Sequence, residues 1–90
     1  MNIESQYVFV IKSCIKKFLP EAKIFLFGSR VQNTNHQFSD IDIAIMDKNI
    51  NSTWLAKIRF ELEESNIPYK IDLVDYYQLD QKILFKAIEL

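Results

Sequence analysis

Residues 22–46 read AKIFLFGSRVQNTNHQFSDIDIAIM. The run at 22–27 is short and rich in aliphatic and aromatic residues, which predicts a buried β-strand. The segment 30–38 is polar and has no hydrophobic period, so it predicts a turn or loop. Residues 39–46 then alternate between isoleucine and polar or small residues, the pattern of a second strand with one buried face. Two strands joined by a polar loop therefore form the centre of the predicted fold.

Helices are expected before and after this centre. Apolar residues recur at steps of three and four over 7–19, which predicts an amphipathic helix that ends before Pro20. After the second strand, Ser52 is placed to cap another helix from Thr53 to about Ser65. Each helix carries one apolar stripe and therefore requires a sheet face to cover.

The C-terminal part predicts one more strand and one more helix. Residues 69–75 read YKIDLVD, which alternates as a strand does. Asp80 is a candidate N-cap for a last helix running through Ile88. The expected order is α-β-β-α-β-α, and this order predicts an α/β (α+β) fold, one small sheet covered by helices, in a single domain over residues 1–90.

Composition excludes several classes of protein. The chain has 90 residues, 49% of them hydrophobic and 26% charged, which is typical of an ordinary globular domain. A net charge of -1 argues against bulk nucleic-acid binding. No leader and no membrane span is apparent, so no membrane association is expected and the cytoplasm is the expected compartment. Cys14 is the only cysteine, and its position among apolar residues predicts a structural thiol.

Three aspartates on predicted strands form a candidate metal site. Asp40 and Asp42 lie at i and i+2, about 6.5–7 Å apart on one strand face, and Asp72 lies on the third strand. If the strands are neighbours, the three carboxylates converge, and hard oxygen ligands suit Mg²⁺. The alternative is an ordinary solvated strand face. Asp75 competes with Asp72 for the third position, although it falls on the opposite face.

The glycine at the end of the first strand is a second candidate feature. Gly28 is the only glycine in the chain and stands where the chain must turn. Glycine lets backbone N–H groups approach a phosphate closely, and the Ser29 hydroxyl adds another donor. The alternative is a strand-ending glycine followed by a capping serine.

Together these motifs resemble the minimal nucleotidyltransferases of the DNA polymerase β superfamily. The family signature is Gly-Ser, ten residues, then Asp-x-Asp. Here it reads Gly28-Ser29, the ten residues 30–39, and Asp40-Ile41-Asp42, and residues 69–75 look like the strand of the third carboxylate. The resemblance covers nearly the whole chain and implies the nucleotidyltransferase fold with a small mixed sheet.

The resemblance also implies a reaction: nucleotidyl transfer from ATP to a hydroxyl, with Mg²⁺, two ions being expected, and release of pyrophosphate. Domains of this size are similar to the antitoxin half of HEPN–MNT toxin–antitoxin pairs, in which the enzyme adds AMP to a tyrosine of its HEPN RNase partner. A homo- or hetero-oligomer is expected. The implied nucleotide-binding residues are Gly28, Ser29 and Arg30, and the implied catalytic and metal-binding residues are Asp40, Asp42 and Asp72.

One segment departs from the family pattern. Relatives continue Gly-Ser-Arg with a small residue, a second arginine and a glycine, whereas this chain has Val31-Gln32-Asn33. The missing arginine and glycine bear on nucleotide affinity and turnover. The altered segment supports one alternative, a binding module that neutralises the HEPN partner by contact alone. A separate alternative keeps the enzyme and changes the acceptor to a small-molecule hydroxyl.

Overall fold

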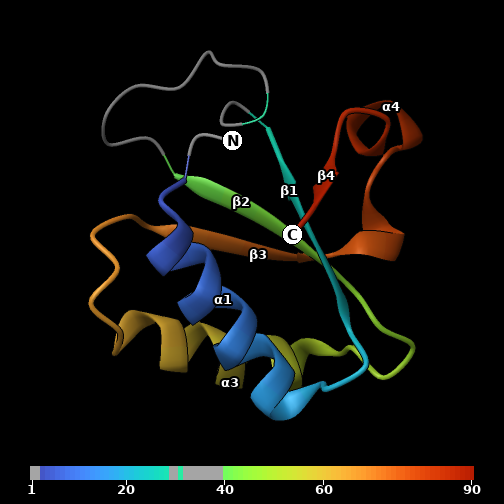
Figure 1. Cartoon of the computed structure of the whole chain (residues 1–90). Coiled ribbons are helices and arrows are strands. Elements are labelled where there is room, and N and C mark those ends of the chain that lie inside the picture. Colours follow the sequence, from blue (N-terminus) through green and yellow to red (C-terminus); the bar gives the residue numbers. More distant parts are fainter. Residues whose placement is uncertain (1–2, 29–30, 32–39) are drawn as a thin grey trace.

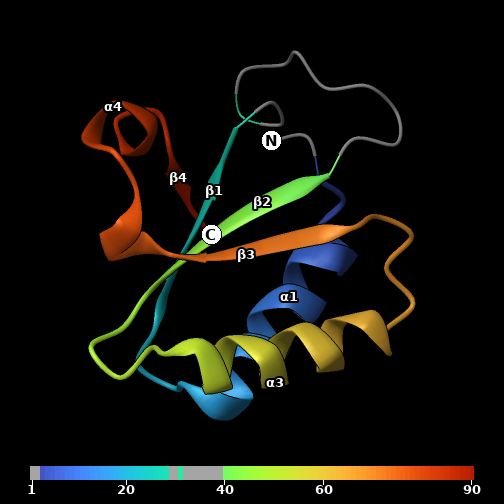
Figure 2. The same cartoon turned by 180° about the vertical axis from the view of Figure 1, so that it is seen from behind.

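The computed structural model describes residues 3–28, 31 and 40–90. In these ranges no helix is long and apolar enough to cross a membrane. Figures 1 and 2 show a twisted sheet with two long helices packed together under one of its faces. The helical elements are α1 (Ser5–Phe18), α3 (Ser52–Glu63), the 3₁₀ turn η1 (Tyr76–Gln78) and α4 (Gln81–Leu84). The strands are β1 (Lys23–Phe27), β2 (Ile41–Met46), β3 (Ile71–Asp75) and β4 (Ile88–Glu89).

The sheet is mixed, as the sequence predicts. Its strand order is β3-β2-β1-β4. β1 runs antiparallel to both β2 and β4, whereas β2 and β3 are parallel and are joined through α3. Two consecutive parallel strands need such a crossover, because the chain must return to the end of the sheet at which the first strand began. This crossover brings the two aspartate-bearing strands next to each other.

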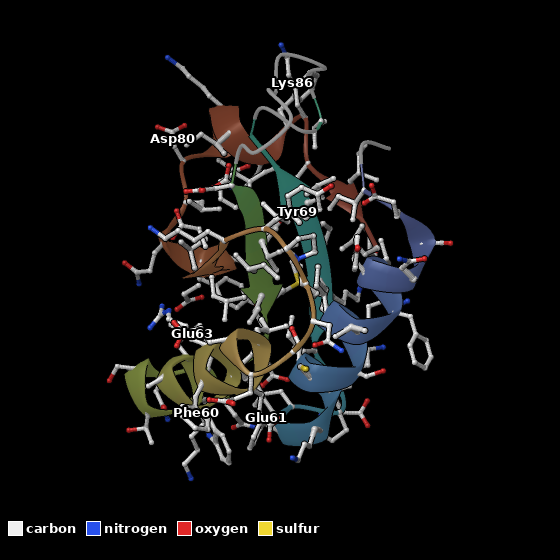
Figure 3. All side chains as sticks on the ribbon, turned by 90° about the vertical axis from the view of Figure 1, so that its left-hand side faces the viewer. Phe60, Glu61, Glu63, Tyr69, Asp80 and Lys86 are labelled. Atoms are coloured by element: carbon white, nitrogen blue, oxygen red, sulfur yellow. The ribbon has the colours of Figure 1, made fainter. Side chains whose placement is uncertain are left out.

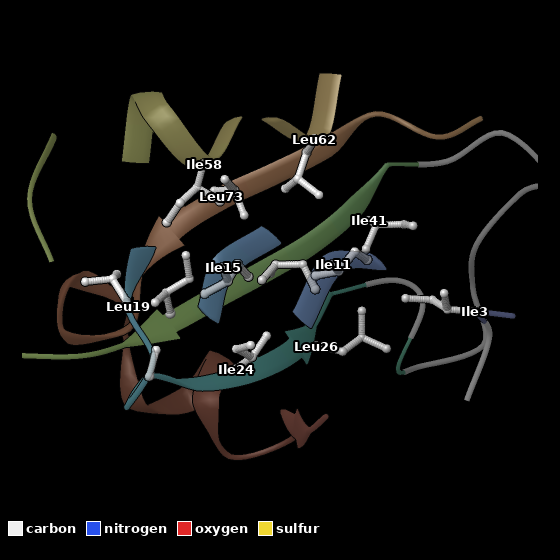
Figure 4. Close-up of a cluster of buried hydrophobic side chains, with 13 residues drawn as sticks. Ile3, Ile11, Ile15, Leu19, Ile24, Leu26, Ile41, Ile58, Leu62 and Leu73 are labelled. Carbon is white, nitrogen blue, oxygen red and sulfur yellow. The ribbon is translucent and has the colours of Figure 1, made fainter. Parts of the chain in front are cut away.

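The core lies between the sheet and the two long helices (Figure 4). Every second residue of β2 contributes an isoleucine that is fully removed from solvent, as the predicted alternation requires. Burial of such side chains stabilises the fold by about 1.5–3 kcal/mol each. The largest fully buried side chains are Ile11, Ile15, Ile24, Leu26, Ile41, Ile43, Ile45 and Ile58.

Cys14 packs at the margin of this core. The side chain is half-buried rather than fully buried, and it contacts the core cluster from α1. Burial raises the pKa of the Cys14 thiol, and the nearby Glu61 raises it further while Lys17 lowers it. The thiol is therefore protonated at neutral pH and poorly nucleophilic, which agrees with a structural role.

The predicted element boundaries need small corrections. α3 begins at Ser52 and is capped by Asn51, whose side-chain oxygen accepts from the N–H of Trp54 at 2.9 Å. The predicted cap was Ser52, one residue later. Asn51 takes this role because its carbonyl reaches the third N–H of the helix, which has no partner inside the helix. β3 begins at Ile71, two residues after the predicted start.

The prediction of a last helix through Ile88 is wrong in its extent. Asp80 caps α4 as expected, accepting from the N–H of Lys82 at 2.7 Å, but α4 ends at Leu84. Ile88 and Glu89 instead form β4 and pair with β1. The physical reason is that the outer edge of β1 would otherwise expose unpaired backbone groups, and the C-terminal residues satisfy them.

Candidate functional site

The parallel pairing of β2 with β3 places two of the predicted aspartates side by side. Asp42 and Asp72 are register partners. Partners on neighbouring strands lie about 4.7–4.9 Å apart and project from the same face. That face is the one turned away from the buried isoleucines of β2. The Asp42 side chain is half-buried and the Asp72 side chain is exposed, so the pair opens toward solvent.

Asp40 adds a third negative charge at the start of β2. It lies immediately before the strand and is half-buried. Burial raises the pKa of the Asp42 carboxyl above its usual value, and the carboxylates of Asp72 and then Asp40 raise it further. The carboxylates of Asp72 and Asp40 thus both disfavour the negative charge of Asp42. A cation among them would relieve this repulsion.

Asp42 and Asp72 form an adjacent pair, with Asp40 nearby, and the three carboxylates do not surround a single metal position. Within residues 3–28, 31 and 40–90, no three His, Cys, Asp or Glu side chains are grouped as ligands of one metal ion. The backbone fixes the proximity of Asp42 to Asp72, whereas Asp40 stands two residues away along the chain. The protein therefore offers two adjacent carboxylates and a third one nearby.

Gly28 lies directly against Asp42. Its φ of +80° belongs to the left-handed region that favours glycine. A Cβ atom at this position would collide with Oδ2 of Asp42 and approach its Cγ to 3.2 Å. The contact follows from the register of β1 and β2, in which Phe27 is the partner of Asp42. The only glycine of the chain is therefore required by the Asp42 carboxylate as well as by the turn.

The remaining nucleotide-binding predictions cannot be placed. Ser29 and Arg30 lie outside the described residues, as do two of the three residues that depart from the family pattern, Gln32 and Asn33. Val31 is described, is half-buried and packs against the core. The roles of Ser29 and Arg30 stay predictions that rest on the motif.

Asp75, the competitor for the third position, has a structural role. It is the register partner of Ile45 and not of Asp42. Its Oδ1 accepts from the N–H of Tyr77 at 3.0 Å and so caps η1. Asp47 likewise serves a turn, accepting from the N–H of Asn49 at 2.8 Å. Neither residue belongs to the carboxylate pair.

Sequence reasoning missed a small cavity that opens beside Asp72. Its volume is about 270 Å³. A larger cavity of about 660 Å³ lies elsewhere, around Trp54 and Met46, and includes none of the three predicted carboxylates. No pattern in the sequence predicts the small cavity, because three separate segments form it. Its lining includes Arg59 and Leu62 from α3, Ile67 and Lys70 from the connection, and Ile71 and Asp72 from β3.

The raised pKa of Asp42 predicts that this residue destabilises the metal-free fold. Above the raised pKa the buried charge is penalised in the folded state and not in the unfolded chain. Asp42→Asn is therefore expected to raise the melting temperature of the metal-free protein near neutral pH. The gain in the free energy of unfolding should stay below about 1 kcal/mol because water screens a half-exposed carboxylate.

This gain should disappear as the pH falls through the pKa of Asp42, where the Asp42 side chain of wild type also becomes neutral. Thermal denaturation in a chelator at neutral and acid pH measures both effects, and a variant less stable than wild type at neutral pH would contradict the argument.

Comparisons with known proteins agree with the fold. The family model for polymerase beta, nucleotidyltransferase, matches residues 10–89. The probable protein adenylyltransferase MntA of Haemophilus influenzae is 30% identical over 78 residues, which cover 84% of this chain and 68% of that protein. The crystal structure of a toxin-antitoxin with AMP-PNP is similar with a TM-score of 0.64 and 27% identity, over 87% of this chain and 70% of that one.

The matched region contains every described element from the middle of α1 to β4. It also contains all six predicted site residues. The family model covers most of the chain, and the relative and the solved structure are similar to it in sequence and fold. The chain therefore belongs to the polymerase β nucleotidyltransferase family and is a nucleotidyltransferase.

Proposed function

We propose that this chain transfers AMP from ATP to a hydroxyl of a partner protein, with Mg²⁺. The acceptor we propose is a tyrosine of a HEPN RNase toxin, which the chain inactivates as its antitoxin. The observation that carries the proposal is the pairing of Asp42 with Asp72 across β2 and β3, directly beside Gly28. The similarity to a probable protein adenylyltransferase and to a toxin-antitoxin structure with AMP-PNP supports the donor and the kind of partner.

The described carboxylates fit Mg²⁺. They are hard oxygen donors, and burial first, then the charges of Asp72 and Asp40, raise the pKa of Asp42, a penalty on its charged form that a cation would offset. Mg²⁺ usually takes only one or two protein carboxylates and completes its coordination with water and substrate phosphates. Two adjacent carboxylates with Asp40 nearby therefore suffice when ATP supplies the other ligands. We assign Asp40, Asp42 and Asp72 to this role, with two ions per site.

The residues have separate tasks in the transfer. An acceptor oxygen forms a bond to the α-phosphorus of ATP, the bond from that phosphorus to the bridging oxygen breaks, and pyrophosphate leaves. Mg²⁺ held by Asp40, Asp42 and Asp72 would neutralise phosphate charge and make the hydroxyl more acidic. Asp72 is the exposed member of the pair and receives or directs the hydroxyl proton. Gly28, Ser29 and Arg30 hold the triphosphate at the end of β1.

The acceptor comes from a second molecule. In our proposal the hydroxyl belongs to the partner protein, and the similarity to a probable protein adenylyltransferase supports this choice. A complex with the partner, rather than an isolated chain, is the working form.

Labelled ATP tests this function. The chain is incubated with Mg²⁺ and the product of the neighbouring gene, in parallel with α-labelled and γ-labelled ATP. The proposal predicts label on the partner from the α-phosphate only, because a nucleotidyl group and not the terminal phosphate is moved. Label from the γ-phosphate would indicate kinase chemistry. A stable complex that takes up no label would favour the module that neutralises its partner by contact alone.

A further inference from the structure

The outer edge of β3 is open to another strand. In the described part of the chain β3 is the terminal strand of the sheet and pairs only with β2. The Lys70 carbonyl accepts from the N–H of Ile41 on the β2 side at 2.9 Å. Successive residues of a strand direct their backbone groups to opposite edges, so those of Ile71 and Leu73 point outward. An extended segment of another chain can pair with them.

The small cavity lies along this edge and suits one side chain. It is formed between α3, the connection 64–70 and the start of β3. Figure 3 shows Glu63, at the end of α3, and Tyr69, just before β3, on the same side of the molecule. The lining is apolar where Leu62, Ile67 and Ile71 contribute. A volume of about 270 Å³ accommodates one large apolar side chain.

The charges around the cavity are arranged for an acidic segment. Arg59 and Lys70 line it and are exposed. Within the described residues, Arg59 and Lys70 form no ion pair. The ion pair that the described residues contain joins Lys17 to Glu61, away from this cavity. When a cation neutralises Asp72, the two basic groups outweigh the remaining Glu63. The local charge therefore favours carboxylates in the bound segment.

We propose that the free edge of β3 receives an extended, acidic acceptor segment as an added strand, a docking mode that rests on the proposed function. Neighbouring residues of a strand point to opposite faces. The residue beside Ile71 would then enter the cavity on the α3 side, and the residue beside Asp72 would face the carboxylates. The acceptor is therefore a hydroxyl residue with a bulky apolar neighbour directly next to it and acidic residues beyond.

Kinetics with a defined probe test this docking. The probe is the capped peptide Ser-Asp-Phe-Tyr-Asp-Ser, with comparison peptides in which serine replaces phenylalanine or lysine replaces both aspartates. The Arg59→Glu/Lys70→Glu variant is expected to raise the KM for the probe about tenfold or more, with the KM for ATP and kcat unchanged. Lys16→Glu/Lys57→Glu is the matched control, since it makes the same charge change at exposed positions outside the cavity. Both comparison peptides should be poorer substrates than the probe.

Hydrogen exchange provides a readout that does not depend on turnover. With Mg²⁺ and AMP-PNP present, the probe is expected to slow exchange of the Ile71 and Leu73 amides. A probe that is neither labelled nor protective, or an Arg59→Glu/Lys70→Glu variant with the wild-type KM, would overturn the docking proposal. Neither result would touch the proposed function, which stands or falls on α-label transfer to the partner protein.

Discussion

Asp42→Asn is expected to reduce nucleotidyl transfer by at least about a thousandfold, the effect of losing roughly 4 kcal/mol of transition-state stabilisation. Asn keeps the shape of the side chain and removes the charge. Asp42 is the member of the pair with two carboxylate neighbours and the one in contact with Gly28. Initial rates of α-label transfer to the partner, at saturating ATP and Mg²⁺, measure the loss.

Asp75→Asn is the matched control for this variant. It makes the same change on the same sheet, but Asp75 caps η1 through an acceptor oxygen that asparagine also has. The control is expected to keep its rate within about twofold of wild type. Equal losses in the two variants would mean that the effect comes from the sheet rather than from the carboxylate pair.

Gly28→Ala is expected to damage both stability and transfer. The left-handed backbone of Gly28 alone makes alanine unfavourable by about 1–2 kcal/mol. The added Cβ also collides with the Asp42 carboxylate, so either β1 or the side chain must move. A displacement near 1 Å at the reacting groups costs about a hundredfold in rate. Melting temperature and initial rate should therefore fall together, in contrast to Asp42→Asn, which loses activity while gaining metal-free stability.

A double variant separates the collision from the backbone strain. Adding Asp42→Ala to Gly28→Ala removes the carboxylate that the Cβ meets. The stability lost in Gly28→Ala should then be partly recovered, giving a coupling of about 0.5 kcal/mol or more, while the rate of transfer falls further because the Asp42 charge is lost. Strictly additive effects on stability would show that the two residues do not contact each other as described.

Sequence patterns predicted the elements of the fold because each pattern depends on one segment. The alternation at Ile41, Ile43 and Ile45 needs only a sheet with one buried face, and the structure confirms it. The prediction that the three carboxylates converge assumed that β2 and β3 are neighbours. The alternation of apolar residues does not show which strands pair. The end of α4 was missed because the need of β1 for an edge partner overrides the apolar spacing around Ile88.

The sequence singles out candidate site residues, but it does not predict the contacts between them. Gly28 stood out as the only glycine, and the motif placed Asp40 and Asp42 at a fixed distance along the chain. The contact between Gly28 and Asp42 depends on the register of β1 with β2, which no local pattern contains. The cavity around Arg59 and Lys70 depends on how α3 packs against β3, so it appears only in the folded chain.

Mn²⁺ binding tests most directly whether the carboxylate pair is the metal site of this enzyme. Mn²⁺ prefers the same oxygen ligands as Mg²⁺ and is detected by electron paramagnetic resonance. Wild type, Asp72→Asn and Asp75→Asn are titrated with Mn²⁺ in the presence of AMP-PNP. Uptake by wild type and Asp75→Asn, with affinity at least about tenfold weaker in Asp72→Asn, is the predicted result. Equal affinity in all three proteins would contradict the assignment of the metal to the pair that β2 and β3 bring together.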